Sequence, residues 1–490
     1  MSRRPAARPL ALGWALLPLV TLVLCFALGV LRFGFSVELL IASMLAAAAV
    51  AGAIAARRGA GWDAVQRSAG EKLAAVLPVV LILLAIGMLI GTWVLSGTIP
   101  LLVTWGIRLV EPGSFVLTAF LVTAVMSLAT GTSWGSAGTL GVALVGAAAA
   151  LGAPLAATAG AVVSGAYLGD KMSPLSDSTN ICALGAGAEL YAHIRHMLYT
   201  AVPSLVLALA VYAVAGGGAA APAGAVAALP PAAARLLGEI GAVFRLDGWA
   251  LLPLVLVVTG VLLKRPPALV LAASALLAAA LGVAVQGFGV EQGVAAAIRG
   301  FDATMALDRI ADPAGPSDLF VRLVGRGGLY SMANTLIVII CAFLLAAGLD
   351  VSGALDRILQ ALLAGVRSVC GLIAATMAAG AVLISLTSHG GVTALVVGGM
   401  FQPAFRERRL APENLSRSLE DSVTIVEPLL PWTVSAIFMA TTLGVPTIEY
   451  LPWAVFCYGG PFFSLLYAAA FARTGIGIRL LAETETGGST

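Results

Sequence analysis

Apolar runs of about 20 residues recur along the whole sequence, beginning with Leu10–Leu31. Because an α-helix rises 1.5 Å per residue, a run of about 20 residues crosses the ~30 Å hydrocarbon core of a bilayer. Apolar residues make up 60% of the 490 residues and charged residues only 10%, against roughly 25% charged residues in soluble domains. The sequence therefore predicts an all-α polytopic membrane protein with roughly 10–12 membrane spans.

Several other classes of protein are disfavoured by the sequence. The net charge of +3 gives no basic surface for nucleic acid. The pattern GxxxxGK[ST] does not occur, so ATP-driven pumping is not expected. Five scattered cysteines without a CxxC pair indicate neither a metal site nor a disulfide framework. Neither an enzyme nor a cofactor is predicted, and Leu10–Leu31 is expected to be a first transmembrane helix, because no small-residue cleavage site follows it.

The chain repeats itself. The string GWALLPLV occurs at Gly13–Val20 and again at Gly248–Val255. Three dipeptides then recur in the same order: Ser96-Gly97 as Ser352-Gly353, Ser127-Leu128 as Ser385-Leu386, and Pro174-Leu175 as Pro428-Leu429. These three intervals are nearly equal and exceed that of the opening string. An internal duplication is therefore predicted, with an insertion in the second half at Gly287–Asn334.

The duplication predicts the organisation of the chain. We expect a first transmembrane repeat at 1–214, a linker with a short interfacial helix at 215–247, a second repeat at 248–474 and a C-terminal tail at 475–490. Lys and Arg favour cytoplasmic loops, and they lie at non-equivalent loops of the two halves. The repeats are therefore predicted to be inverted, with the N-terminus in the cytoplasm, an arrangement that secondary transporters use to place a site near the midplane.

Polar, Gly- and Pro-containing stretches interrupt the apolar runs at four places: Thr130–Ser136, Gly169–Asn180, Ser388–Val392 and Glu420–Trp432. The segments between the first two are too short for comfortable crossings. We therefore predict a re-entrant hairpin over Ser114–Leu151, with its tip at the first stretch, and then a helix unwound at the second. The second half is expected to repeat this design. Non-helical backbone at membrane depth must be buried or line a wet cavity, where it can bind ions.

Six ionisable residues fall at the two predicted interrupted helices: Asp170, Lys171 and Asp177 in the first half, and Glu420, Asp421 and Glu427 in the second. A charged side chain at the centre of a membrane helix costs about 2.5–3.5 kcal/mol, which favours a role in binding. Two structural alternatives stay open. Asp170 and Lys171 could form an ion pair, and Glu420 and Asp421 could lie at an interface near Arg417.

The candidate ion- or substrate-binding residues are Thr130, Thr132, Ser133, Asp170, Lys171, Ser173, Asp177, Ser178, Thr179, Asn180, His389, Glu420, Asp421, Thr424 and Glu427. His389, at the second hairpin tip, is either a pH-responsive group or a neutral hydrogen-bonding one. Other polar and aromatic residues receive structural roles: Trp134 and Trp432 in packing, His193 and His196 at the membrane interface, and Glu413 with Arg417 as a surface helix pair.

The motifs resemble a known family. GAYLGDKMSPLSDSTN (Gly165–Asn180) is similar to the signature of the NhaC family of sodium/proton antiporters, and so are LAPENLSRSLEDSVTIVEPLLPW (Leu410–Trp432), LGVPTIEYLPWAVFCY (Leu443–Tyr458) and RGGLYSMANT (Arg326–Thr335). The resemblance covers nearly the whole chain. It implies a multi-pass secondary transporter of the bacterial inner membrane, driven by Na⁺ and H⁺ gradients, with inverted repeats and often dimeric. At Glu427 the chain departs from the family pattern, which commonly has a small hydroxyl residue there.

Two transport functions follow from these motifs. In the first, cytoplasmic Na⁺ exchanges for external H⁺. The Asp170 and Asp177 carboxylates would bind Na⁺ or protons in turn, and hydroxyls at Ser173, Ser178 and Thr179 would complete an oxygen shell.

In the second, a small organic acid or amino acid is carried with Na⁺ or H⁺. Half-helix N-termini would hold its carboxylate, and Lys171 would be the counter-charge. A channel or a non-transporting scaffold is disfavoured by the matched breaks.

Overall fold

The computed structural model describes residues 10–34, 36–216, 229–310, 312, 315–388 and 390–481. In this part of the chain the secondary structure is helical, apart from an isolated bridge that pairs Leu410 with Leu480. Nine of the described helices are long and apolar enough to cross a membrane, and the number rises to 11 if each of two bent pairs is one span. The prediction of an all-α polytopic membrane protein is confirmed.

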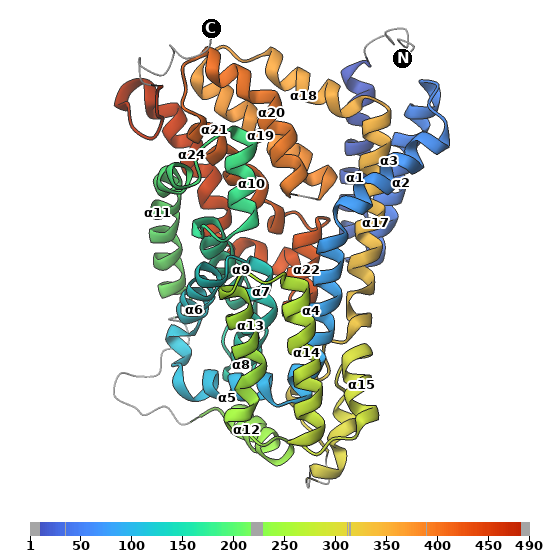
Figure 1. The fold of residues 1–490 in the computed structure, drawn as a ribbon, viewed down its shortest axis with the longest axis vertical. Helices are drawn as coiled ribbons and strands as arrows, with labels where there is room; N and C mark the ends of the chain where they lie inside the picture. The colour runs from blue at the N-terminus through green and yellow to red at the C-terminus, as the bar shows by residue number, and fades with distance from the viewer. Residues whose placement is uncertain are drawn as a thin grey trace.

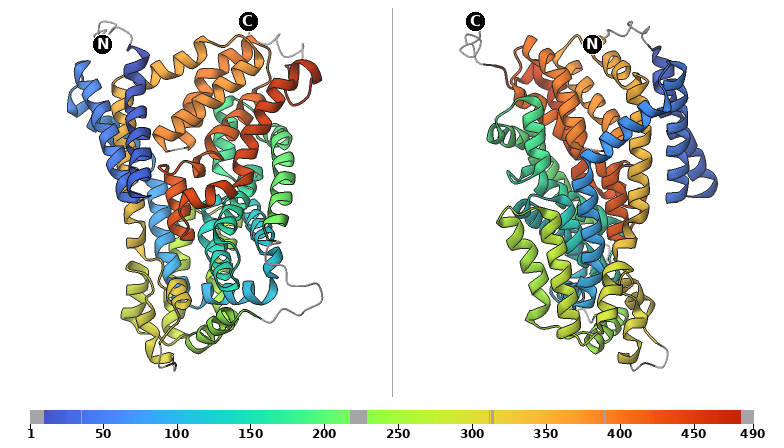
Figure 2. Two further views of the ribbon diagram at one scale, coloured as in Figure 1. Left: turned by 180° about the vertical axis from the view of Figure 1, so that it is seen from behind. Right: turned by 45° about the vertical axis from the view of Figure 1, so that its right-hand side comes forward.

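The first half contains α1 to α11 (Figure 1). Their bounds are α1 Leu12–Phe33, α2 Val37–Arg57, α3 Trp62–Ala75, α4 Leu77–Leu95, α5 Thr98–Leu109, α6 Phe115–Thr130, α7 Ser133–Ser136, α8 Val142–Leu151, α9 Leu155–Met172, α10 Asp177–Ala186 and α11 Leu190–Ala215. A π-helical turn, η2 (Ala137–Gly141), joins α7 to α8. In the side view of Figure 2, α1 and α2 form an outlying hairpin at one edge of the molecule.

The second half follows α12 (Pro231–Val243), the helix predicted at the end of the linker; residues 217–228 of the linker lie outside the described residues. Its helices are α13 Leu252–Leu262, α14 Pro267–Ala284, α15 Val290–Ile298, α16 Asp318–Val324, α17 Ala333–Val351, α18 Ala354–Ala364, α19 Val369–Thr387, α20 Gly390–Glu407, α21 Pro412–Leu419, α22 Val434–Leu443, α23 Thr447–Tyr450 and α24 Val455–Thr474. Helices α15 and α16 lie within the predicted insertion.

The repeated Ser-Gly dipeptides mark the same turn in both halves. Helices α4 and α17 each end at the serine, and the following glycine begins the next helix. Gly97 has φ +81° and Gly353 has φ +70°, a left-handed conformation that costs glycine little because it has no Cβ. The recurrence of the dipeptide thus has a conformational reason.

Contacts between the halves are reciprocal. Helix α4 packs on α14, and α17 packs on α2. Likewise α1 packs on α18, while α5 contacts η4 (Gly248–Leu251), the turn that precedes α13. Exchanging the halves converts each contact into its counterpart. Such reciprocity is what a twofold arrangement of two repeats would produce, and the inverted repeat itself stays a prediction.

The two hairpins reach the middle of the molecule from opposite ends. In Figure 1, α6 to α8 lie in the lower half and α19 and α20 in the upper half. The first tip turns at Gly131, with φ +67°, and Thr132 then caps α7 by accepting a hydrogen bond from the Gly135 N–H at 3.2 Å. The second tip turns at Ser388, with φ +48°. Each tip points toward the other half of the chain.

Both predicted interrupted helices are broken in the structure. Helix α9 ends at Met172 and α10 begins at Asp177, after Ser176 caps it. In the second half, α21 continues into the π-helical turn η7 (Glu420–Thr424) and the 3-10 turn η8 (Glu427–Leu429) before α22 begins. The axis bends by 45° at that break.

One expectation for polar residues was wrong. Glu413 and Arg417 were predicted as a surface pair but are buried, because residues 475–481 fold over α21. Glu413 pairs with Arg479 at 2.9 Å, and Arg417 donates to the Gly477 carbonyl at 2.7 Å.

His193 and His196 were predicted at the membrane interface and are also buried. They face the same element, since the Oγ atom of Ser416 in α21 lies 2.7 Å from Nδ1 of His193.

Candidate ion-binding site

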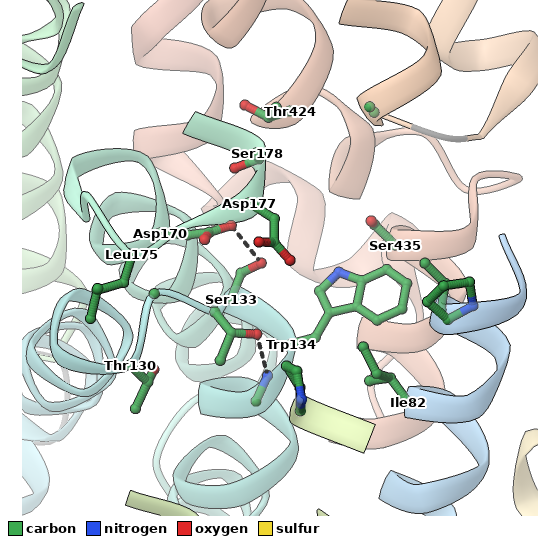
Figure 3. Close-up of a pocket in the computed structure, with 18 of the residues that line it drawn as sticks. Ile82, Thr130, Ser133, Trp134, Asp170, Leu175, Asp177, Ser178, Thr424 and Ser435 are labelled. Carbon is green, nitrogen blue, oxygen red and sulfur yellow. Dashed lines mark hydrogen bonds between the residues drawn. The ribbon is translucent and has the colours of Figure 1, made fainter. Parts of the chain in front are cut away.

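A cavity of about 740 Å³ lies where the broken helices and the hairpin tips meet (Figure 3). Both halves of the chain line it. The predicted site residues among its lining are Thr130, Thr132, Ser133, Asp170, Asp177, Ser178, Thr424 and Glu427. The structure thus brings about half of the candidates together around one space.

Asp170 connects the first break to the first hairpin tip. Asp170 lies in the last turn of α9, and the residue is 9% exposed. The Ser133 hydroxyl, at the start of α7, donates to Asp170 Oδ2 at 3.0 Å (Figure 3). A carboxylate held by a hydroxyl at the wall of a cavity can accept a cation from the open side.

Asp177 provides a second carboxylate from the other side of the break. It is the first residue of α10 and is exposed to the cavity, next to Ser178. In Figure 3, Asp170 and Asp177 lie around Ser133 and Trp134. The positive end of the α10 dipole also favours negative charge at this position.

The tryptophans pack as expected. Trp134 stacks on Phe438, with ring centroids 4.8 Å apart, and it also lines the cavity. Trp432 meets Phe26 edge-on and donates to the Ser385 carbonyl at 3.0 Å. Trp134 therefore forms a wall of the site, whereas Trp432 supports the second hairpin from behind.

Lys171 and Asp421 form a buried ion pair away from the cavity lining. Both side chains are 0% exposed, and the pair joins α9 of the first half to η7 of the second. The Thr200 hydroxyl of α11 lies 3.3 Å from Lys171 Nζ and 3.3 Å from Asp421 Oδ1. Lys171 was also considered as a partner of Asp170, which is wrong because its ion pair is with Asp421; its role as a counter-charge for substrate stays a prediction.

Three further candidates shape the first break. Ser173 donates to the Leu128 carbonyl at 2.9 Å. The hydroxyl of Thr179 contacts the freed carbonyls of Asp170 and Lys171 at 3.2 and 3.1 Å. Asn180 donates to two more carbonyls of the break, at 3.1 and 2.7 Å. These side chains do not line the cavity, because they satisfy backbone groups that the interruption leaves unpaired.

The second-half acids occupy different environments. Glu420 is fully buried, and its Oε1 accepts a hydrogen bond from Thr424 at 2.6 Å. Glu427 is 8% exposed and lines the cavity, while its backbone carbonyl accepts from Thr433 at 2.6 Å. His389 lies outside the described residues. Of the second-half acids, only Glu427 reaches the cavity lining.

The sequence analysis missed several lining residues: Tyr167, Lys264, Arg265, Ser388 and Ser435. Lys264 and Arg265 form the turn between α13 and α14, where Lys264 has φ +55°. They were interpreted only as loop charges. Tyr167 precedes Asp170 by three residues, a helical spacing that places both side chains on one face, and this signal could have found it.

A closed metal centre is not evident. Among the described residues, no group of three or more His, Cys, Asp or Glu side chains is placed to hold a metal ion. An ion in this cavity would therefore depend on two or three carboxylates and on hydroxyl oxygens.

A membrane protein whose described residues are almost all helical, and whose broken helices and hairpin tips enclose a cavity lined in part by acids and hydroxyls, is, by class, a secondary active transporter. The chain belongs to the Na⁺/H⁺ antiporter family, whose sequence model matches residues 9–179 and 165–470. The resemblance inferred from the motifs is thereby confirmed.

Three relatives illustrate the range of the family. An uncharacterized Na⁺/H⁺ antiporter of Haemophilus influenzae is 41% identical over 464 residues, covering 95% of this chain and 96% of the relative. The Na⁺/H⁺ antiporter NhaC of Alkalihalophilus pseudofirmus is 34% identical and covers 85% of this chain and 86% of its own. The arginine/ornithine antiporter ArcD of Halobacterium salinarum is also 34% identical, with 92% and 90% covered.

Proposed function

We propose that this protein exchanges cytoplasmic Na⁺ for external H⁺ by alternating access, as a multi-pass protein of the bacterial inner membrane with a cytoplasmic N-terminus. Membership of the Na⁺/H⁺ antiporter family supports this function. The observation that carries it is the cavity at the first break, where Asp170 and Asp177 face open space beside the hydroxyls of Ser133 and Ser178.

The donor set suits the exchange of a hard cation for a proton. Carboxylate and hydroxyl oxygens are the ligands that hard cations prefer. A proton and Na⁺ compete for the same carboxylate oxygens, so the site holds one or the other. Coupling follows if only the loaded site changes its exposure from one side of the membrane to the other.

The Lys171–Asp421 pair limits which carboxyl groups can bind and release ions during exchange. An ammonium group compensates the charge of Asp421 in the interior. The carboxyls left to bind and release ions are those that line the cavity, namely Asp170, Asp177 and Glu427. The ion pair then acts as a connection between the halves of the chain.

The test uses purified protein in liposomes with an imposed pH gradient and a trapped pH dye. Na⁺, Li⁺ or K⁺ is added outside, for the wild type, Asp170→Asn and the control Asp63→Asn, which changes an exposed acid on α3. We expect Na⁺ to dissipate the gradient in the wild type and the control but not in Asp170→Asn. Folded wild-type protein that responds to no cation would refute the proposal.

A second candidate function keeps the cavity and changes the cargo to a small organic acid or amino acid. The volume of about 740 Å³ lies in the range of pockets for small organic molecules, and Lys264 and Arg265 among its lining could pair with a carboxylate. A relative named as an arginine/ornithine antiporter adds support. Uptake of labelled amino acids and dicarboxylates into the same liposomes separates the two functions.

A further inference from the structure

A second cavity, of about 790 Å³, lies apart from the site described above. It is formed by the loops that follow α15 and α16 and by the end of α22. In Figure 1, α15 lies at the end of the molecule opposite the two chain ends. Its lining includes Arg299, Asp302, Arg322, Arg326 and Thr442.

The lining of this second cavity is positively charged. It contains the guanidinium groups of Arg299, Arg322 and Arg326, and Asp302 is its one acid. The Asp302 carboxylate accepts a hydrogen bond from the Thr304 backbone N–H at 2.8 Å, as the cap of the following turn. None of the three arginines forms an ion pair with another described residue. The described residues that line the space therefore carry a surplus of positive charge.

Two buried polar atoms at this cavity lack partners within the described part of the chain. They are Nη1 of Arg326 and the hydroxyl oxygen of Thr442. The Nε of Arg326 is satisfied, since it donates to the Arg322 carbonyl at 2.9 Å. Buried polar groups in native proteins are nearly always hydrogen-bonded, so these two atoms indicate an occupant that accepts hydrogen bonds.

The position of Arg326 is fixed by close backbone packing. Gly327 and Gly328 follow it with φ +77° and +82°. The Gly328 N–H donates to the Gly87 carbonyl of α4 at 2.7 Å, and a Cβ on Gly327 would lie 2.2 Å from the Gly91 nitrogen. Only glycine fits this contact. The backbone at Arg326 is thus fixed, and the hydrogen bond from its Nε to the Arg322 carbonyl orients the side chain before any ligand arrives, which lowers the entropic cost of binding.

We propose that this second cavity binds an anionic oxygen group, a carboxylate or a phosphate, between Arg326, Arg322 and Thr442. The group could belong to a small solute or to a lipid headgroup, since both present the same acceptor oxygens to arginine. This site lies apart from the first cavity, but one helix, α22, contributes to both. Helix α22 begins with Val434 and Ser435 at the first cavity and carries Thr442 at the second.

The experiment measures binding without transport. The full chain is purified in an uncharged detergent and a Tris chloride buffer free of carboxylate and phosphate, and inorganic phosphate and malate are titrated by calorimetry. In parallel, thermal unfolding is compared in nanodiscs with and without phosphatidylglycerol. The variants are Arg326→Gln and Arg322→Gln, the second on an exposed side chain, and the control Arg367→Gln changes an exposed arginine elsewhere.

We expect saturable binding of phosphate or malate that both cavity variants weaken about tenfold or more, because a charged hydrogen bond is lost, while the control stays within about twofold of wild type. Stabilisation by phosphatidylglycerol alone, lost in the same variants, also supports the site and identifies a lipid as its ligand. Absence of any arginine-dependent effect of phosphate, malate or lipid would overturn the proposal. None of these outcomes depends on Na⁺/H⁺ exchange.

Discussion

Neutralising Lys171 alone should destabilise the protein far more than neutralising both members of its ion pair. The side chains of Lys171 and Asp421 are fully buried, and Oδ2 of Asp421 has no other partner among the described residues. Lys171→Met would leave a carboxylate without its counter-charge in the interior. Breaking a buried pair in this way costs about 3–5 kcal/mol.

The double variant Lys171→Met/Asp421→Leu should recover most of that loss. Replacing both charges by apolar groups of similar volume removes the desolvation cost together with the attraction, and is often neutral. An exposed pair provides the matched control. Lys72 and Asp350 lie 3.1 Å apart with side chains 24% and 49% exposed, so Lys72→Met should cost at most about 1 kcal/mol.

The assay is unfolding of the purified protein in detergent, followed by intrinsic tryptophan fluorescence. It is applied to the wild type, to Lys171→Met, Asp421→Leu and their double variant, and to the corresponding variants of Lys72 and Asp350. The coupling free energy from this cycle should be several times larger for the buried pair than for the exposed one. The reasoning is refuted if Lys171→Met unfolds within about 1 kcal/mol of wild type, or if the double variant is as unstable as the single one.

Three further outcomes are expected. Ser133→Ala removes the hydroxyl that donates to the cavity carboxylate of α9 and should raise the Na⁺ concentration for half-maximal exchange by about 3- to 10-fold; an unchanged value would count against that carboxylate as a ligand. Gly91→Ala places a Cβ 2.1 Å from a carbonyl oxygen of α15 and should lower the free energy of unfolding by about 1–3 kcal/mol. Gly52→Ala, with no atom within 4 Å, should raise it by roughly 0.5–1 kcal/mol. Hydrogen bonds from the backbone N–H groups of Tyr191 and Ala192 lower the pKa of Glu189. The carboxylate therefore stabilises the fold above its unfolded-state pKa of about 4.3, and this stabilisation is lost as the pH falls through the folded-state value; Glu189→Gln should flatten the acid side of the stability profile measured by unfolding.

The interruptions of the helices could be predicted because local chemistry determines them. Gly131, Pro174 and the Ser-Gly turns disfavour continued helix wherever they stand. The recurrence of the dipeptides in order predicts two matched halves. Contacts within a few residues are encoded locally, so the hairpins and the broken helices follow from composition and spacing.

The direction in which an individual side chain points, toward the cavity or toward another helix, could not be predicted in the same way. Asp170 and Lys171 are neighbours in sequence, but consecutive residues on a helix point about 100° apart. One therefore lines the cavity, and the other pairs with Asp421 in the opposite half. Spacing along one segment carries no information about a partner that lies so far away in the chain.

The sequence also could not predict which polar residues tertiary packing would bring to the cavity or bury. Lys264 and Arg265 lie in an exposed turn, as their charge suggests, but the packing of α13 and α14 that brings this turn to the cavity has no local signal. Burial of Arg417 and Glu413 depends on the C-terminal segment that covers α21. Tertiary cover of this kind leaves no periodic signal in the covered helix.

The position at which the chain departs from the family pattern has an electrostatic consequence. The charged residues described around the first cavity are Asp170, Asp177 and Glu427 against Lys264 and Arg265. With all five ionised, the lining carries one net negative charge, which a single Na⁺ or a single proton neutralises. A hydroxyl in place of Glu427 would make the same lining neutral. If the proposed exchange is correct, Glu427 supplies a third carboxylate to a cavity that already holds Asp170 and Asp177.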